Sequence, residues 1–397
     1  MAIDEKQFSK RAQALQPSAT LAVSKKAKEM AAAGEDVINL GMGEPDFETP
    51  KPIAAAAVAA IQSGQTSFYT PVGGTLSLRK GIAQLAERLT GQELSAKQVT
   101  VTTGAKMALY ALSQILVNPG DLVVAAKPYW VSYAEQVGLA GGRFEALGDD
   151  RFGKLTVAAL NALDEKPKVI LLNNPTNPSG VLYSKAELQA ILDWAEAADC
   201  FLIVDEIYGR LVYNGAHFTS VLSLAQLNNR KLIVVDGVSK SYSMTGWRIG
   251  WALADEQIIA ELNKVLGHMT SNPTAVAQAA AEAAVTGDQQ MVESIRQVFE
   301  KRLNTTYAAI QELPGLTVSD KPEGAFYFFI KIEDELLKRL HLNSSADFAK
   351  VLLEEEKVAL PAGEGFGKPG YLRLSYAKDQ AAINEALKRI KRFITKD

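Results

Sequence analysis

The chain has 397 residues, of which 47% are hydrophobic, so it is long enough to bury one large core and a second, smaller one. Its formal net charge of −3 gives no reason to expect nucleic acid or an anionic membrane as a partner. A single cysteine excludes an intramolecular disulfide, and the three scattered histidines show no metal-ligand spacing, so we expect no metal site. Because the N-terminus is charged and no apolar run reaches membrane-spanning length, we expect a cytoplasmic protein.

The first hundred residues alternate alanine-rich helical segments with loops rich in glycine and proline. A short apolar run, Val37–Leu40, predicts a strand, and the loop G-M-G-E-P-D-F-E-T-P follows it. We expect helices at about 23–33, 52–63 and 75–90, the second beginning near two prolines that suit a first helical turn.

The middle of the chain alternates apolar runs with helical segments. We expect strands at Val99–Thr102, Leu122–Ala126, Val169–Leu172, Phe201–Val204 and Leu232–Val235, and helices that include Met107–Val117 and Lys185–Ala198. Near-continuous runs of Val, Ile and Leu between helices are typical of a parallel sheet whose two faces are both covered. The fold class is therefore α/β, with a mostly parallel sheet in a large domain.

The C-terminal third changes pattern. Residues 256–312 are nearly all helical by periodicity, and Phe299–Glu312 is expected to belong to a long helix between two bodies. A mixture of strands and helices follows, at Leu316–Ser319, Ala325–Ile332, 345–356, Tyr371–Tyr376 and 380–394. We expect a large domain over 48–300 and a smaller α+β domain made from 1–47 and 301–397.

Polar residues follow several of these strands, where an open parallel sheet binds its ligands. The turn T-G-A-K-M-A comes after Val99–Thr102 and leads into a helix whose N-terminus can hold a phosphate, although such turns are also common without a ligand. N-N-P-T-N-P-S-G comes after Val169–Leu172, and its two X-Pro steps can fix Asn177 as a hydrogen-bond donor; an ordinary turn is the alternative.

Two further strand ends carry charge. D-E-I-Y follows Phe201–Val204, so Asp205 is expected to be buried and to need a cationic partner, either a ligand nitrogen or a structural arginine. S-K-S-Y-S-M-T-G-W-R-I-G follows the last strand and places Lys240 before Arg248. A lysine alone is most often solvated, but burial frees its amine, and an arginine beside it can bind a phosphate-bearing aldehyde.

Together these groups match the needs of pyridoxal 5′-phosphate: a Schiff-base lysine, a partner for the ring nitrogen, phenolate donors and a phosphate cradle. The sequence resembles the fold-type I, class I pyridoxal-phosphate aminotransferases over essentially its whole length. The matching motifs are G-E-P-D-F-E-T-P, Y-T-P-V-G-G, N-P-T-N-P-S-G, D-E-I-Y, S-K-S-Y-S-M-T-G-W-R-I-G and R-L-S-Y-A.

The resemblance implies a role for each residue at the cofactor. Lys240 would form the Schiff base and shuttle the substrate proton, and Asp205 would pair with the ring nitrogen. Asn177 and Tyr208 would donate to the 3′ oxygen, and Trp130 would stack on the ring.

The resemblance also implies how the phosphate is held. The residues concerned are Gly104, Ala105 and Lys106, through their backbone, and Arg248, through its guanidinium. Tyr69 would reach the phosphate of the neighbouring subunit, which implies a homodimer with shared active sites. One departure is visible: the family often has serine where this chain has Gly237, and Ser239 is given no phosphate contact.

On the substrate side, the resemblance assigns the α-carboxylate to Arg373, with Gly43 close by and Trp130 and Asn177 also lining the site. Similarity to bacterial aspartate aminotransferases assigns the distal carboxylate to a second set, namely Lys106, Ser18 and Thr20. Helix capping by the two hydroxyls and a purely structural lysine are the alternatives.

These assignments imply transfer of the amino group of L-aspartate to 2-oxoglutarate, giving oxaloacetate and L-glutamate. Some relatives that accept prephenate have lysine where this chain has Gln16, which makes that activity a weaker expectation. Three competing interpretations remain. The protein could be an aromatic or alanine aminotransferase, a C–S lyase on the same scaffold, or a regulator that binds the cofactor without turnover.

Overall fold

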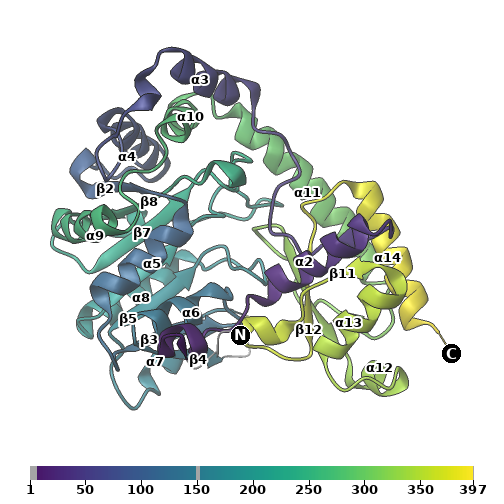
Figure 1. Ribbon diagram of the computed structural model, residues 1–397. Helices are drawn as coiled ribbons and strands as arrows, with labels where there is room; N and C mark the ends of the chain where they lie inside the picture. Colours follow the sequence, from purple (N-terminus) through teal and green to yellow (C-terminus); the bar gives the residue numbers. More distant parts are fainter. Residues whose placement is uncertain (1–6, 149–152, 397) are drawn as a thin grey trace.

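A seven-stranded sheet forms the centre of the larger body in the computed structural model, which describes residues 7–148 and 153–396 (Figure 1). The strand order is β2-β8-β7-β6-β5-β3-β4. The bounds are β2 Val99–Thr102, β3 Leu122–Lys127, β4 Arg143–Gly148, β5 Val169–Asn173, β6 Phe201–Asp205, β7 Leu232–Gly237 and β8 Gly250–Ala254. The pairs of β3 with β4, β3 with β5, β5 with β6 and β6 with β7 are parallel, so the predicted α/β class is confirmed.

Two strands of this sheet were not predicted. β4 pairs only with β3 and carries half-exposed and exposed residues, so it shows no apolar run. β8 is wholly buried and runs antiparallel to both β2 and β7. Its sequence G-W-A-L-A lacks the β-branched residues that indicate a strand. The sheet is therefore mostly, but not entirely, parallel.

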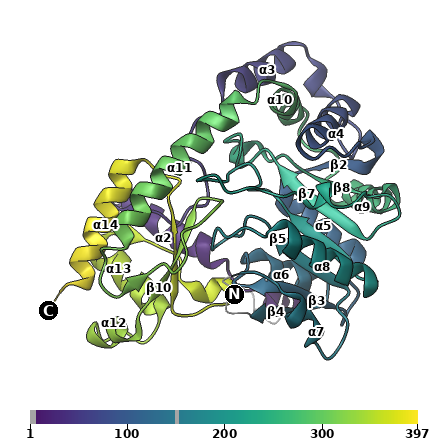
Figure 2. The ribbon, with the colours of Figure 1, turned by 180° about the vertical axis from the view of Figure 1, so that it is seen from behind.

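Helices cover both faces of the sheet, as expected (Figures 1 and 2). Alternate residues of β3 show the two faces. Val123 belongs to the core cluster that includes residues of α5 and α9, whereas Val124 belongs to the cluster that includes residues of α4, α8 and α10. The helices of this body are α3 Lys51–Gln62, α4 Leu76–Thr90, α5 Ala105–Leu116, α6 Ser132–Leu139, α7 Val157–Asn161, α8 Lys185–Ala197, α9 Glu256–Met269 and α10 Ala275–Thr286.

A second body has its own core around a three-stranded antiparallel sheet of order β12-β10-β9. Its elements are β9 Leu316–Thr317, β10 Tyr327–Ile332, α12 Asp334–Arg339, α13 Ser345–Glu356, β11 Val358–Ala359, β12 Tyr371–Ser375 and α14 Gln380–Ile394. The long helix α11, Gln290–Ile310, begins in the core of the first body and ends in that of the second (Figure 1). The domain boundaries themselves stay a prediction.

The N-terminal segment crosses between the two bodies before the chain enters the large one. It contains α1 Lys10–Ala14, α2 Ala19–Ala32 and β1 Ile38–Asn39, and β1 pairs in parallel with β11. Helix α2 begins four residues earlier than predicted, and Ser18 occupies its N-cap position without making a side-chain capping bond. Helix α1, which was not predicted, is a single short turn capped by Ser9.

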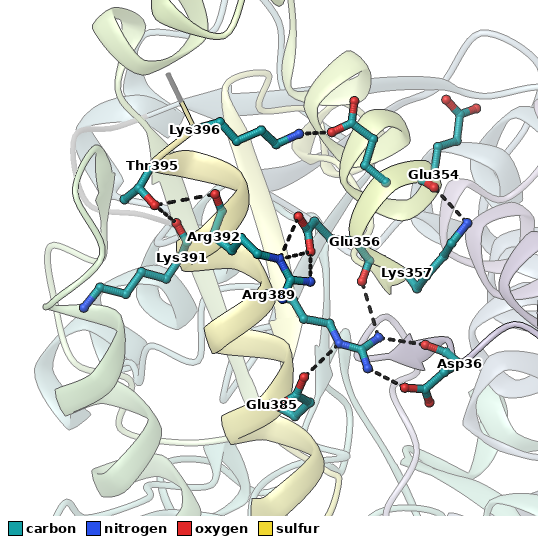
Figure 3. A network of polar contacts seen from close by, with 11 residues as sticks. Asp36, Glu354, Glu356, Lys357, Glu385, Arg389, Lys391, Arg392, Thr395 and Lys396 are labelled. Carbon is teal, nitrogen blue, oxygen red and sulfur yellow. Dashed lines mark hydrogen bonds and ion pairs between the residues drawn. The ribbon is translucent and has the colours of Figure 1, made fainter.

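Side chains of α14 tie this segment to the second body (Figure 3). Arg389 donates to the backbone oxygen of Asp36 at 2.7 Å, pairs with the Asp36 carboxylate, and bonds Glu385 at 3.1 Å. One turn along, Arg392 pairs with the buried Glu356 of α13. This network holds the chain just before β1, which leads directly to Gly41–Gly43.

Among the described residues, no helix is long and apolar enough to cross a membrane.

Candidate active site

A cavity of about 320 Å³ lies at the carboxyl ends of β5, β6 and β7, where the N-terminal segment and the second body meet the large sheet. It brings together most of the predicted site residues. Those that line it are Thr20, Gly43, Ala105, Lys106, Trp130, Asn177, Asp205, Tyr208, Lys240, Arg248 and Arg373. Residues from eight separate stretches of the chain thus meet at the place where an open α/β sheet binds ligands.

Lys240 stands three residues beyond the end of β7. Its Nζ donates to the backbone oxygen of Gly43 at 2.7 Å, so the amine faces the N-terminal segment across the cavity. Burial, together with the nearby positive charges of Arg373 and Arg248, lowers the pKa of Lys240 to about 8, while Glu44 opposes that shift. The side chain is therefore an amine that loses its proton readily near neutral pH.

Asp205 is the last residue of β6 and is 5% exposed. Its carboxylate accepts hydrogen bonds from the Tyr133 hydroxyl at 3.0 Å and from the backbone N–H of Ile207 at 3.2 Å. Burial raises the pKa of Asp205 to about 6, and the two hydrogen bonds and Lys240 limit that rise. No arginine pairs with it in the described parts of the chain, so a cation from outside the chain would be its natural partner.

A buried arginine, Arg373, also lines the cavity. Arg373 of β12 is 3% exposed and donates to the side-chain oxygen of Asn177 at 3.1 Å and to the backbone oxygen of Gly41 at 2.7 Å. Its Nε is buried without a hydrogen-bond partner among the residues described. Since the Asn177 oxygen accepts from Arg373, the amide nitrogen of Asn177 is the group that remains as a donor.

The N-terminus of α5 lies beside Arg248 at the cavity. Gly104 is the N-cap with φ 83°, and a Cβ there would lie 2.5 Å from the Arg248 Nη2. The first backbone N–H groups of a helix have no partner within it, so those of Ala105 and Lys106 are donors for an anion. A helix N-terminus facing a guanidinium, with only hydrogen at residue 104, fits a phosphate group.

The departure at Gly237 has a steric cause. Gly237 pairs with Gly250 across β7 and β8, and a Cβ at residue 237 would lie 2.9 Å from both the Gly250 Cα and the Ile249 oxygen. A serine here would force the two strands apart, so the close approach of the strands requires glycine.

Lys106 and Trp130 stand together at the cavity. The Lys106 Nζ lies 4.9 Å from the centre of the Trp130 ring, and burial and then the Arg248 charge lower the pKa of Lys106. Thr20 of α2 lines the same cavity, and its hydroxyl lies 3.1 Å from that of Ser18. Ser18 itself does not line the cavity.

Tyr69 lies away from this cavity within its own chain. It is 92% exposed, and its neighbour Phe68 is 75% exposed. This loop therefore leaves two adjacent aromatic side chains open to water.

Several residues of the cavity region were not predicted, among them Asn173, Glu44 and Tyr327, which line it, and Tyr133, which bonds Asp205. Tyr133 is visible in P-Y-W-V-S-Y, three residues after Trp130, so helical spacing could have placed it beside that ring. Tyr327 bonds the hydroxyl of Tyr208 at 2.8 Å. Its place depends on how β10 pairs with β12, for which the sequence carries no local signal.

Comparison with known proteins agrees with this geometry. The family model "Aminotransferase class I and II" matches residues 35–390. The aspartate aminotransferase of Bacillus subtilis and the asparagine–oxo-acid transaminase of Streptococcus mutans are each 45% identical to this chain, over 98% of it and 99% of their own length. The solved structure of Thermus thermophilus aspartate aminotransferase with maleate has a TM-score of 0.90 and 35% identity, covering 97% of this chain and 99% of that one.

Proposed function

Because the chain belongs to the class I and II aminotransferases, we propose that it moves the amino group of L-aspartate to 2-oxoglutarate with pyridoxal 5′-phosphate as cofactor. The observation that carries the proposal is the cavity that joins the Lys240 amine, the Asp205 carboxylate and the Arg373 guanidinium. The products are oxaloacetate and L-glutamate.

The residues present fit the cofactor. Lys240 would hold it covalently, Asp205 would keep its ring nitrogen protonated, and Asn177 and Tyr208 would donate to its 3′ oxygen. Trp130 would cover the ring. When bound, the cofactor supplies the electron sink that takes up the electrons of the broken Cα–H bond.

The phosphate would be held by the N–H groups at the start of α5 and by Arg248. The Lys240 amine, once free, is the base that takes the proton from the substrate Cα, and its lowered pKa suits that role near neutral pH. Lys240 therefore both attaches the cofactor and moves the proton.

Two cationic side chains would each bind one carboxylate of the dicarboxylic substrate. Arg373 would pair with the α-carboxylate through two of its N–H groups. Lys106, with the hydroxyls of Thr20 and Ser18, would take the distal carboxylate. Aspartate and 2-oxoglutarate both carry a second carboxylate, so the same pocket serves both half-reactions.

Asparagine is the second candidate donor, since one relative at 45% identity is named an asparagine–oxo-acid transaminase. Threonine and serine hydroxyls can bond a carboxamide as well as a carboxylate, whereas a lysine favours the carboxylate. The position of Lys106 beside the cavity therefore supports aspartate as the first choice.

We also propose a two-fold homodimer in which Tyr69 reaches the partner's phosphate. Support comes from the exposure of Phe68 and Tyr69 and of the apolar Val58 and Ile61 on the neighbouring helix α3. A closed two-fold dimer covers such a patch on both subunits at once. The cytoplasmic location stays a prediction.

The test is a panel of amino donors against 2-oxoglutarate with the purified protein. We expect aspartate to have the highest kcat/KM, with asparagine, alanine and phenylalanine below it. Borohydride reduction followed by peptide mass analysis should fix the cofactor on Lys240. Labelling of Lys106, or a preference for an aromatic donor, would contradict the proposal.

A further inference from the structure

Tyr327 lies where three residues of the proposed site meet. It begins β10, is 1% exposed, and lines the cavity. Its ring centre lies 4.5 Å from the guanidinium carbon of Arg373, and its hydroxyl lies 2.8 Å from that of Tyr208. A Cβ at Gly43 would overlap the Tyr327 hydroxyl, so glycine there leaves room for it.

The guanidinium carbon of Arg373 lies over the ring of Tyr327. It also lies over the ring of Phe366, whose centre is 4.9 Å from the same carbon. The N–H groups lie in the guanidinium plane, so the two rings stabilise the buried cation without competing for its donors. The cation therefore stays charged and keeps its edge available for a carboxylate.

The hydroxyl of Tyr327 acts at the other end of the site. Each phenol has one O–H proton, so if Tyr208 donates to a ligand oxygen, the proton between the two phenols must come from Tyr327. A hydroxyl that accepts a hydrogen bond is also a stronger donor, because hydrogen-bond chains polarise one another.

We propose that Tyr327 is a positioning residue that sets both ends of the site, holding Arg373 through its ring and directing the Tyr208 hydroxyl through its own. The inference rests on the proposed function, since it assigns Arg373 to the substrate carboxylate and Tyr208 to the 3′ oxygen of the cofactor. A single side chain then aligns the two ligands with each other.

The ring is tested by the affinity of the holoenzyme for succinate, which has two carboxylates and neither an amino nor an oxo group. Tyr327→Leu should raise the Kd of succinate roughly five- to thirtyfold in calorimetry, the range for losing a desolvated cation–π contact. Tyr327→Phe keeps the ring and should change the Kd less than about twofold. Should Tyr327→Leu not fold, Tyr327→Met, which fills more of the space, takes its place.

The matched control is Phe328→Leu. Phe328 is the next residue of β10, so its side chain points to the opposite face of the strand from that of Tyr327. It is fully buried, and its ring centre lies 5.1 Å from that of Tyr376. The Phe328→Leu variant should lower the Tm, as Tyr327→Leu does, and should leave the Kd of succinate unchanged. An equal rise in Kd for both variants would show that Tyr327 is merely structural.

The hydroxyl is tested by the pH at which the visible absorption of the bound cofactor changes. Weaker donation to the 3′ oxygen favours the protonated chromophore, so Tyr327→Phe should move the midpoint upward by roughly half a pH unit to one unit. Tyr208→Phe should move it further in the same direction, and Phe328→Leu should not move it. An unchanged midpoint in Tyr327→Phe would overturn the inference.

The wild type separates this inference from the function on which it rests. If the wild type binds neither the cofactor nor succinate, the proposed function fails and the inference fails with it. If the wild type binds both, and Tyr327→Leu and Tyr327→Phe behave as the wild type does, only the role of Tyr327 is overturned.

Discussion

We propose that substrate choice depends on Lys106, which lines the cavity. A second carboxylate left without its cation in a closed site would cost a few kcal/mol, on the order of a hundredfold in kcat/KM. Lys106→Ala should therefore lower kcat/KM for aspartate by about that factor and affect alanine much less. The backbone N–H of residue 106 is retained, so the Kd of the cofactor, measured in parallel, should change little. A variant that loses all donors equally would remove Lys106 from the specificity role.

Tyr133 helps to hold down the pKa of Asp205, together with the backbone N–H of Ile207 and the charge of Lys240. The Asp205 pKa of about 6 is already above its usual value because of burial, and the Tyr133 hydrogen bond lowers it. Tyr133→Phe removes that bond, so the Asp205 pKa rises further and a larger fraction is protonated near neutral pH. The acidic limb of the profile of kcat/KM against pH should move upward by about one unit.

The control for that shift is Tyr129→Phe. Tyr129 packs against Phe144 with ring centres 4.8 Å apart and does not bond Asp205. Its variant should keep the acidic limb of the wild type. If Tyr133→Phe also keeps it, the ionisation of Asp205 does not limit the reaction.

At the scale of elements, Arg389 of α14 is expected to hold the N-terminal segment. Its side chain is only 12% exposed, and it bonds the Asp36 backbone, the Asp36 carboxylate and Glu385. Arg389→Ala should lower the Tm by a few degrees because it removes a donor from the backbone oxygens of Asp36 and Glu356.

The neighbouring Lys388→Ala is the matched control. Lys388 is 77% exposed and reaches Glu385 only at 3.9 Å, and an exposed ion pair of this kind contributes little. In thermal unfolding experiments, the Tm of Arg389→Ala should therefore be lower than that of Lys388→Ala. Equal Tm values would show that the network around Arg389 does not stabilise the fold.

Prediction from sequence succeeded for elements whose pattern is local. The five apolar runs of the large sheet confirm this, since each became a buried strand within two residues of its expected bounds. It failed where pairing decides the structure: β4 has one neighbour and so no apolar run, and β8 is recognised only through its partners β2 and β7.

The same distinction applies to the site. Asp205 ends a strand, and Asn177 and Lys240 come shortly after the ends of two others, so their meeting could be predicted from the order of strands. Tyr327 reaches Arg373 diagonally across two antiparallel strands, opposite Ser375 in register, and that register depends on tertiary packing.

At the scale of the whole molecule, the proposed dimer makes each active site depend on two chains. Each proposed site uses Lys240 from one subunit and Tyr69 from the other. A mixed dimer of Lys240→Ala and Tyr69→Phe therefore contains one site in which both residues are intact. Activity after mixing the two variants should exceed the sum of the separate activities. Mixing Lys240→Ala with Arg373→Ala should restore nothing, because both residues serve the same subunit. An active monomer in sedimentation would refute the shared site.

Because the site residues come from distant parts of the sequence, they are synthesised at different times. The groups proposed to hold the cofactor are complete once β8 ends at Ala254, whereas Tyr327 and Arg373 come later and the strand β11 that anchors β1 lies between them. At ribosomal rates of about 5–20 residues per second, the roughly 120 residues from Ala254 to Arg373 take on the order of 6 to 24 seconds. By the proposed roles, a nascent chain would contain its own cofactor-holding groups before it contained Arg373. A chain released early would then carry the reactive lysine without the arginine proposed to bind the substrate.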